Sequence, residues 1–250
     1  MGPRRVIGTI LAMRAMRLSL PILIGLGSLF FANTMSAQTV PVDTMKEVEI
    51  TAEPLHHLVL ENRYVRVYKV EIAPHSATLL HRHRHDYVFV TLGEAHIANE
   101  VEGKAAVEVK LTDGDTRFTP GDFAHVARNL ADTPFRNVTI ELMQDEKKGM
   151  DGPSLPGEAG DETLRGRREI LFRKDGARVW EMGLEPGVGL TRDGSRPGLL
   201  VALGEVEVDS GGEGRTEKLA AGDIHWFAAE DHNRIRNAGE RATRFVMVEF

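Results

Sequence analysis

Three histidines alternate along the segment HRHRHDYVFVTLGE, residues 81–94. Side chains two residues apart on a β-strand project from the same face, so His81 and His83 are expected to point together into a barrel interior, followed by His85 if the strand continued. Neutral imidazoles a few ångströms apart are good ligands for first-row metals but repel one another once protonated. The spacing therefore predicts a metal site, with a polar surface strand as the alternative interpretation.

A third ligand is available in the segment TPGDFAHVARN, residues 119–129, where His125 follows a Pro-Gly turn and begins another apolar stretch. Two histidines from one strand and one from a neighbour would form a facial set with open positions for water, substrate or dioxygen. A catalytic site of this kind needs a titratable group beside the ion, and Asp86 and Tyr87 are the candidates that we predict to be catalytic.

The elements that must position these residues are strands. Between Glu61 and Met143 apolar and polar residues alternate, as in VEVKL at 107–111, and no stretch keeps a helical period for three turns. Short strands separated by frequent Gly and Asp turns favour an all-β sandwich or barrel.

The second half of the chain repeats the first in outline. RVYKVEIAPH (66–75) resembles RVWEMGLEPG (178–187), VTLGEAHI (90–97) resembles VALGEVEV (201–208), and RNVTIEL (136–142) resembles TRFVMVEF (243–250). The offsets stay between about 107 and 112 residues, which indicates a duplicated unit. A stretch rich in Gly, Pro and charge, residues 144–168, separates the two copies and is predicted to be a linker.

These residues resemble the motifs of the cupin family, which read approximately H-x-H, three or four residues, E, six residues, G, and then a Pro-Gly turn, H, three residues, N. The matching positions are His81, His83, Asp86, Gly93, His125 and Asn129. The resemblance covers both copies after about residue 60. It implies tandem double-stranded β-helix (jelly-roll) cupin barrels, a bicupin fold.

The first motif departs from the cupin pattern, because its spacing is one residue short and the usual glutamate is Asp86. Three alternatives follow: Asp86 replaces the glutamate, His85 becomes the fourth ligand, or the site uses three histidines only. In the second copy Arg192 and Gly194 stand where the first has His81 and His83, so we expect the second barrel to hold no metal.

The predicted domain organisation has five parts. Residues 1–37 combine a basic start with an apolar run of 14 residues, Leu18 to Phe31, which indicates a cleaved signal peptide. An N-terminal extension (38–60), a metal-binding barrel (61–143), the linker (144–168) and a degenerate barrel (169–250) follow. We therefore expect a periplasmic or secreted protein with no stable membrane anchor after processing.

The charge of the chain and its lack of cysteine exclude several classes of partner and of chemistry. The first 37 residues hold 4 of the 31 Lys and Arg and none of the 37 Asp and Glu, so the processed chain would carry 27 basic and 37 acidic residues, a formal charge of −10. Nucleic acid is therefore not an expected partner. The chain has no cysteine, which excludes disulfides, thiolate ligands and a Cys nucleophile.

The resemblance implies an exported metal-dependent cupin enzyme that holds one divalent ion (Fe, Cu, Mn, Ni or Zn) and acts on a small organic or carbohydrate-derived substrate. We favour an oxidoreductase of the dioxygenase type. The alternatives are a metal-dependent isomerase or lyase, and a non-catalytic bicupin that binds a small sugar or acid. Because many cupins associate through sheet edges and faces, a homodimer is a further expectation.

Overall fold

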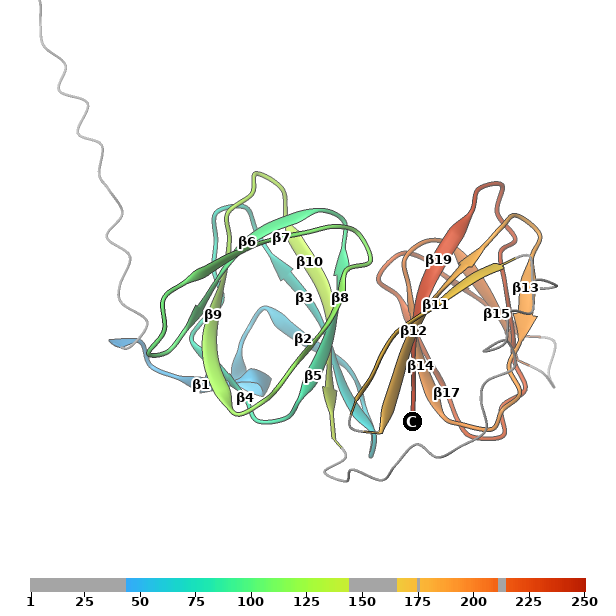
Figure 1. The fold of residues 1–250 in the computed structure, drawn as a ribbon, viewed down its shortest axis with the longest axis horizontal. Helices are drawn as coiled ribbons and strands as arrows, with labels where there is room; N and C mark the ends of the chain where they lie inside the picture. Colours follow the sequence, from blue (N-terminus) through green and yellow to red (C-terminus); the bar gives the residue numbers. More distant parts are fainter. Residues whose placement is uncertain (1–43, 144–165, 175, 211–214) are drawn as a thin grey trace, which may run out of the picture. The chain divides into compact units, whose positions relative to one another are not determined.

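Figure 1 shows the chain as a computed structural model, which describes residues 44–143, 166–174, 176–210 and 215–250. Regular structure in these residues consists of strands and one short 3-10 helix. Within the same residues, no helix has the length and hydrophobicity that a membrane span requires. The predicted signal peptide and nearly all of the predicted linker lie outside the described residues. The predicted all-β class is confirmed.

The first barrel is built from two five-stranded sheets, ordered β1-β4-β9-β6-β7 and β2-β3-β10-β5-β8. Its elements are β1 (Val48–Glu49), the 3-10 helix η2 (Ile50–Ala52), β2 (His56–Glu61), β3 (Val65–Ile72), β4 (His81–His83), β5 (Tyr87–Leu92), β6 (Ala95–Val101), β7 (Val107–Leu111), β8 (Thr116–Thr119), β9 (Phe123–Asn129) and β10 (Phe135–Leu142).

The two sheets of the first barrel face each other across an apolar cluster. Val70 and Ile72 of β3 and Phe135 of β10 come from one sheet, and Ile97 of β6 and Leu111 of β7 come from the other. Successive side chains on a strand point to opposite faces of the sheet, so only every second residue of each strand faces this interior. The barrel therefore has a defined inner face, into which β4 and β9 project their histidines.

The predicted N-terminal extension is part of this barrel. β1 pairs in parallel with β4, so that Val48 lies opposite His81, and β2 pairs with β3 at the edge of the other sheet. The structure thus differs from the expected boundary at residue 61. The reason is that pairing between β1 and β4, or between β2 and β3, satisfies backbone groups that the short strands would otherwise leave open at the sheet edges.

The second barrel repeats this architecture with a five-stranded sheet, β11-β12-β19-β14-β17, and a four-stranded sheet, β13-β18-β15-β16. Its strands are β11 (Gly166–Lys174), β12 (Ala177–Leu184), β13 (Gly189–Thr191), β14 (Gly198–Ala202), β15 (Val206–Ser210), β16 (Arg215–Leu219), β17 (Ile224–Phe227), β18 (Arg234–Arg236) and β19 (Thr243–Glu249).

The repeats in the sequence fall on equivalent strands. The three matched pairs of segments lie mainly on β3 and β12, on β5–β6 and β14–β15, and on β10 and β19. These strands occupy the same places in the two sheet orders, because β3-β10-β5 corresponds to β12-β19-β14. The duplication predicted from the sequence is therefore a duplication of the fold.

A buried asparagine closes the equivalent turn in each barrel. The Asn129 side chain donates to the carbonyl oxygens of Ile72 (3.0 Å) and Thr133 (2.8 Å), and that of Asn237 donates to those of Leu184 (2.9 Å) and Arg241 (2.7 Å). Each amide ties the end of one strand to a neighbouring turn. In the first barrel this holds the end of β9, the strand that carries His125.

Apolar residues cover the outer faces of three strands in the first barrel. Val88 and Val90 of β5 and Val138 and Ile140 of β10 belong to one buried cluster with Val65 and Val67 of β3 and with residues of β12, β14 and β19. The alternate residues of β5 and β10 face the barrel interior and include polar ones, Tyr87, Asn137 and Thr139, beside the apolar Phe89 and Phe135. The inner faces of these two strands are thus of mixed polarity, while their outer faces are apolar.

Candidate metal centre

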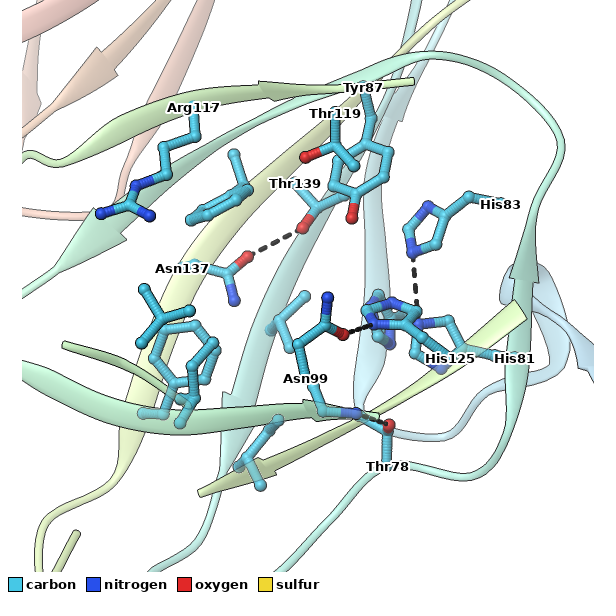
Figure 2. Close-up of a pocket in the computed structure, with 18 of the residues that line it drawn as sticks. Thr78, His81, His83, Tyr87, Asn99, Arg117, Thr119, His125, Asn137 and Thr139 are labelled. Atoms are coloured by element: carbon cyan, nitrogen blue, oxygen red, sulfur yellow. Dashed lines mark hydrogen bonds between the residues drawn. The ribbon is translucent and has the colours of Figure 1, made fainter. Parts of the chain in front are cut away.

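The first barrel encloses a cavity of about 200 Å³ between its two sheets, shown in Figure 2. The side chains that line it include four histidines, one arginine, several neutral polar residues and an apolar remainder. They are His56, Val70, Ile72, Thr78, His81, His83, Tyr87, Phe89, Ile97, Asn99, Val109, Leu111, Arg117, Thr119, His125, Ala127, Phe135, Asn137 and Thr139.

The structure brings the three predicted histidines together at one end of this cavity. His81 and His83 lie on the inner face of β4, and β4 pairs with β9 so that His81 lies directly opposite His125. The ring centroid of His125 is 4.5 Å from that of His81 and 5.2 Å from that of His83. All three residues are buried, and the Nε2 atoms of His81 and His83 are 3.2 Å apart.

Hydrogen bonds orient two of these rings. Nδ1 of His81 is 2.9 Å from the carbonyl oxygen of Leu79, and Nδ1 of His125 is 2.5 Å from Oδ1 of Asn99. Since carbonyl and amide oxygens accept, each Nδ1 carries the proton and each Nε2 keeps its lone pair. Nε2 of His125 is buried without a hydrogen-bond partner among the described residues. These are the features of rings that are set up to hold a cation.

A buried carboxyl group faces the outer side of His83. Oε1 of Glu141 lies 3.8 Å from Nδ1 of His83, and neither atom has a hydrogen-bond partner among the described residues. Burial raises the pKa of Glu141, although Arg66, 3.3 Å from Oε2, opposes that shift. Carboxyl groups in this position commonly orient a metal-bound imidazole.

Burial also keeps the histidines neutral. It lowers the pKa of His81 to about 4, and the pKa values of His83 and His125 lie well below the ordinary value for histidine. Repulsion among the neighbouring imidazoles acts in the same direction. At neutral pH the cluster therefore presents unprotonated nitrogens, which is the form that binds a metal.

A fourth histidine reaches the cluster from β2. Nitrogen atoms of His56, His81 and His83 that can act as ligands all lie within 4.8 Å of one another, and the His56 ring centroid is 4.6 Å from that of His81. Sequence reasoning gave His56 no role. No regular spacing connects His56 with His81, because the two lie on strands of different sheets.

Tyr87, a predicted catalytic residue, lies beside the cluster. Its ring stacks on that of His83, with centroids 4.1 Å apart and an angle of 19° between the planes. Burial raises the pKa of Tyr87 to about 12, while a hydrogen bond with Thr119 opposes the shift. Figure 2 shows the hydroxyl directed into the cavity, between Thr139 and the histidines. A neutral phenol is therefore available inside the cavity at physiological pH.

Comparison with known proteins gives matches in structure. No family model matches the chain, and no curated protein matches it in sequence. A cupin 2 conserved barrel domain protein from Leptotrichia buccalis aligns with 77% of this chain and 86% of its own, with a TM-score of 0.50 and 10% identity. The chain has the cupin fold. Its two barrels in tandem give it a bicupin-like architecture.

Two enzymes share the two-barrel architecture. Salicylate 1,2-dioxygenase from Pseudoaminobacter salicylatoxidans, in a structure with gentisate, aligns over 75% of this bicupin and 68% of its own chain, with a TM-score of 0.53 and 15% identity. Oxalate decarboxylase from Bacillus subtilis, which has Mn(II) centres, aligns over 75% and 69%, with a TM-score of 0.54 and 12% identity. These likenesses establish the fold.

His85 and Asp86, the other two predicted site residues, lie outside the cavity lining. Both residues lie in the connection between β4 and β5, and neither is among the residues that line the cavity. Oδ1 of Asp86 accepts a hydrogen bond of 2.7 Å from the backbone N–H of Gly121. Asp86 thus binds the turn before β9, and a role for either residue as a ligand or in catalysis stays a prediction.

The second barrel of the bicupin lacks a comparable cluster in its described residues. Arg192 is buried there, with its guanidinium 4.3 Å from the centroid of the Phe227 ring. His232 is exposed, and Nδ1 of His225 is 2.6 Å from a carboxylate oxygen of Glu217. Large apolar side chains, including Trp180, fill the interior. That the second barrel holds no metal stays a prediction.

The cavity of the first barrel is a site for one divalent metal ion. Its donors are imidazole nitrogens, which suit Fe, Cu, Ni and Zn in particular. Two observations show that these residues fit an ion: the Nε2 atoms of His81 and His83 face each other, and Nε2 of His125 is buried and unpaired. Unpaired buried nitrogens are costly unless a ligand satisfies them.

Proposed function

We propose that this bicupin is an exported, metal-dependent oxidoreductase of the dioxygenase type, which acts on a small oxygenated organic substrate in the cavity of its first barrel. One observation carries the proposal: the same cavity has imidazole nitrogens close together at one end and polar side chains along its wall. The dioxygenase and decarboxylase with the same architecture support an enzymatic role.

The polarity of the wall supports a bound substrate. Asn137 and Thr139 on β10 point inward and share a hydrogen bond of 2.8 Å, while the residues that alternate with them, Val138 and Ile140, are apolar and point outward. An interior needed only for stability would reverse this arrangement, because burying polar groups is costly. Inward amide and hydroxyl groups can instead orient a ligand that carries oxygen atoms.

Arg117 gives the cavity a positive group at a distance from the histidines. Figure 2 shows Arg117 at the opposite end from His81, His83 and His125. A carboxylate oxygen of Asp115 lies 3.7 Å from this guanidinium, whose side chain is 47% exposed. An acidic group on a substrate would be attracted to this end of the cavity. Both small carboxylic acids and carbohydrate-derived acids have the size and polarity for the site.

Tyr87 is the group that can donate a hydrogen bond or a proton to the substrate. Its stacking on His83 keeps the hydroxyl beside the metal-binding nitrogens. Apolar neighbours such as Phe89 and Ile97 exclude bulk water from the same space. A bound iron or copper ion would supply the redox chemistry for reaction with dioxygen, and a bound manganese, nickel or zinc ion would supply Lewis acidity.

The test begins with the metal content of protein purified without chelators, beside the His81→Ala and His125→Ala variants. We expect one equivalent of a redox-active ion, lost in both variants. Oxygen consumption is then measured with phenolic acids, hydroxy acids and sugar acids as substrates. A redox-inert ion with no oxygen uptake would favour an isomerase or lyase. A metal-loaded protein that binds these acids without turnover would favour the non-catalytic alternative.

Export is proposed from the composition of residues 1–37. A signal peptide that ends near Ala37 would release a chain starting before β1 and leave the whole metal site intact. Mass spectrometry of the protein recovered from the periplasm or the medium should give a mature N-terminus near residue 38. A full-length mass in the cytoplasmic fraction would contradict the proposal.

A further inference from the structure

His56 reaches the cavity of the first barrel from a segment that precedes the cupin motifs. It lies at the first residue of β2, lines the cavity, and has its ring centroid 4.6 Å from that of His81 and 6.2 Å from that of His83. Its side chain is 6% exposed. The next residue, His57, is exposed, as alternation along a strand requires.

Glu53 determines which nitrogen of His56 faces the cluster. Oε2 of Glu53 is 2.6 Å from Nδ1 of His56, and the Glu53 side chain is fully buried. Because a carboxylate accepts hydrogen bonds, Nδ1 of His56 is the donor and Nε2 retains the lone pair. A histidine held by a carboxylate in this way is a better metal donor, since the carboxylate fixes the ring and raises its basicity.

The same carboxylate also links His56 to His81. Oε1 of Glu53 accepts a hydrogen bond of 3.2 Å from the backbone N–H of Leu79, and Oε2 accepts one of 2.8 Å from the backbone N–H of Leu55. The carbonyl oxygen of Leu79 in turn accepts a hydrogen bond of 2.9 Å from Nδ1 of His81. Two imidazoles from different sheets are therefore oriented through one buried side chain.

We propose that His56 is an additional imidazole ligand of the metal ion in the first barrel, and that Glu53 is its positioning residue. The proposal rests on the metal site that the proposed function requires. The cupin motif has a glutamate among its ligands. In this chain the additional ligand would instead be a neutral imidazole from β2, that of His56. The ion would have histidine ligands without a carboxylate and would keep its full double charge toward a substrate.

The test measures Co²⁺ and Cu²⁺ binding by the metal-free full chain and by four variants. His56→Ala removes the donor, Glu53→Gln removes the charge that positions it, His81→Ala is the positive control, and His57→Ala is the matched control on the same strand. We expect the Co²⁺ dissociation constant to rise at least tenfold in His56→Ala and about 10- to 100-fold in Glu53→Gln. His57→Ala should bind Co²⁺ as the parent does.

Spectroscopy distinguishes a ligand from a residue that only supports the fold. Pulsed EPR of the Cu²⁺ form counts coordinated imidazoles, and His56→Ala should lose one while His57→Ala loses none. Free imidazole added to His56→Gly should restore the parental spectrum. Circular dichroism of the metal-free variants checks that each is folded, and the imidazole rescue keeps the test valid if Glu53→Gln unfolds.

Two negative outcomes are separable. If His56→Ala keeps the parental affinity and imidazole count while His81→Ala loses the ion, His56 is not a ligand and the metal site itself stands. If the parent binds neither ion, the metal site fails, and the proposed function fails with this inference.

Discussion

Nε2 of His81 and Nε2 of His83 face each other at 3.2 Å inside the first barrel, while Nδ1 of His81 is held by the carbonyl oxygen of Leu79. A bound cation would give both nitrogens a ligand bond in place of the single hydrogen bond that they can share. The metal therefore contributes to the stability of the barrel as well as to its chemistry.

Metal loading should raise the thermal stability of the protein. An ion that binds the native state only, present at 100 times its dissociation constant, stabilises by about 2.7 kcal/mol. Differential scanning calorimetry with and without a chelator measures this shift. In His81→Ala the shift should vanish, and in the control His75→Ala, an exposed residue beside Asp132, it should persist. An equal shift in His81→Ala would contradict a site at β4.

The metal-free protein should lose stability in mild acid. The native pKa of His81 is about 4, below the ordinary 6.5, so the unfolded chain takes up the proton first as the pH falls. Stability is therefore complete above about pH 6.5 and decreases toward pH 4, by roughly 3 kcal/mol from His81 alone. Urea unfolding at a series of pH values measures the slope.

The matched control for the acid experiment is His81→Gln, which should show a shallower slope between pH 6.5 and pH 4. If the parent and the variant have the same slope, the buried imidazole is not the group responsible.

Gly121 should be intolerant of a side chain. A Cβ there would lie 2.5 Å from the carbonyl carbon of His85 and 2.9 Å from the amide nitrogen of Asp86. The same turn holds β4 through the bond from the Asp122 N–H to the carbonyl oxygen of His83, 2.7 Å. We expect Gly121→Ala to cost about 1–3 kcal/mol of unfolding free energy and to weaken Co²⁺ binding.

Gly93→Ala serves as the comparison for Gly121. Gly93 has a φ of 82° and no atom within 4 Å of the added Cβ, so its substitution introduces backbone strain without a clash. It should lower stability and leave Co²⁺ affinity unchanged. Unchanged Co²⁺ affinity in Gly121→Ala as well would show that the turn does not position β4.

Tyr87→Phe should separate catalysis from metal binding. The substitution keeps the ring that stacks on His83 and removes the hydroxyl that points into the cavity. We expect metal content to stay at the parental level and kcat to fall by roughly 10²- to 10⁴-fold if the phenol transfers a proton. Tyr64→Phe, which lies near Trp226, is the control and should retain full activity. Parental kcat in Tyr87→Phe would exclude the phenol from the reaction.

Much of the site could be predicted because it depends on local periodicity. Alternation along β4 places His81 and His83 on one face, and the Pro-Gly turn indicates the start of the next strand, β9, which carries His125. The alternation of residues along the strands does not predict the course of the chain after His83. Asp86 accepts a hydrogen bond from the backbone N–H of Gly121, a contact that depends on the packing of two turns.

The amino-acid sequence by itself determined the all-β duplicated fold, the absence of thiolate chemistry, and the choice of the first barrel as the metal-binding one. Each of these follows from composition, from the period of a strand or from the repeat of a motif. Only the tertiary structure decided that His56 reaches the same cavity as His81, with Glu53 bonded to its Nδ1. Residues on opposite sheets come together through the closure of the barrel, and no spacing along the chain encodes that contact.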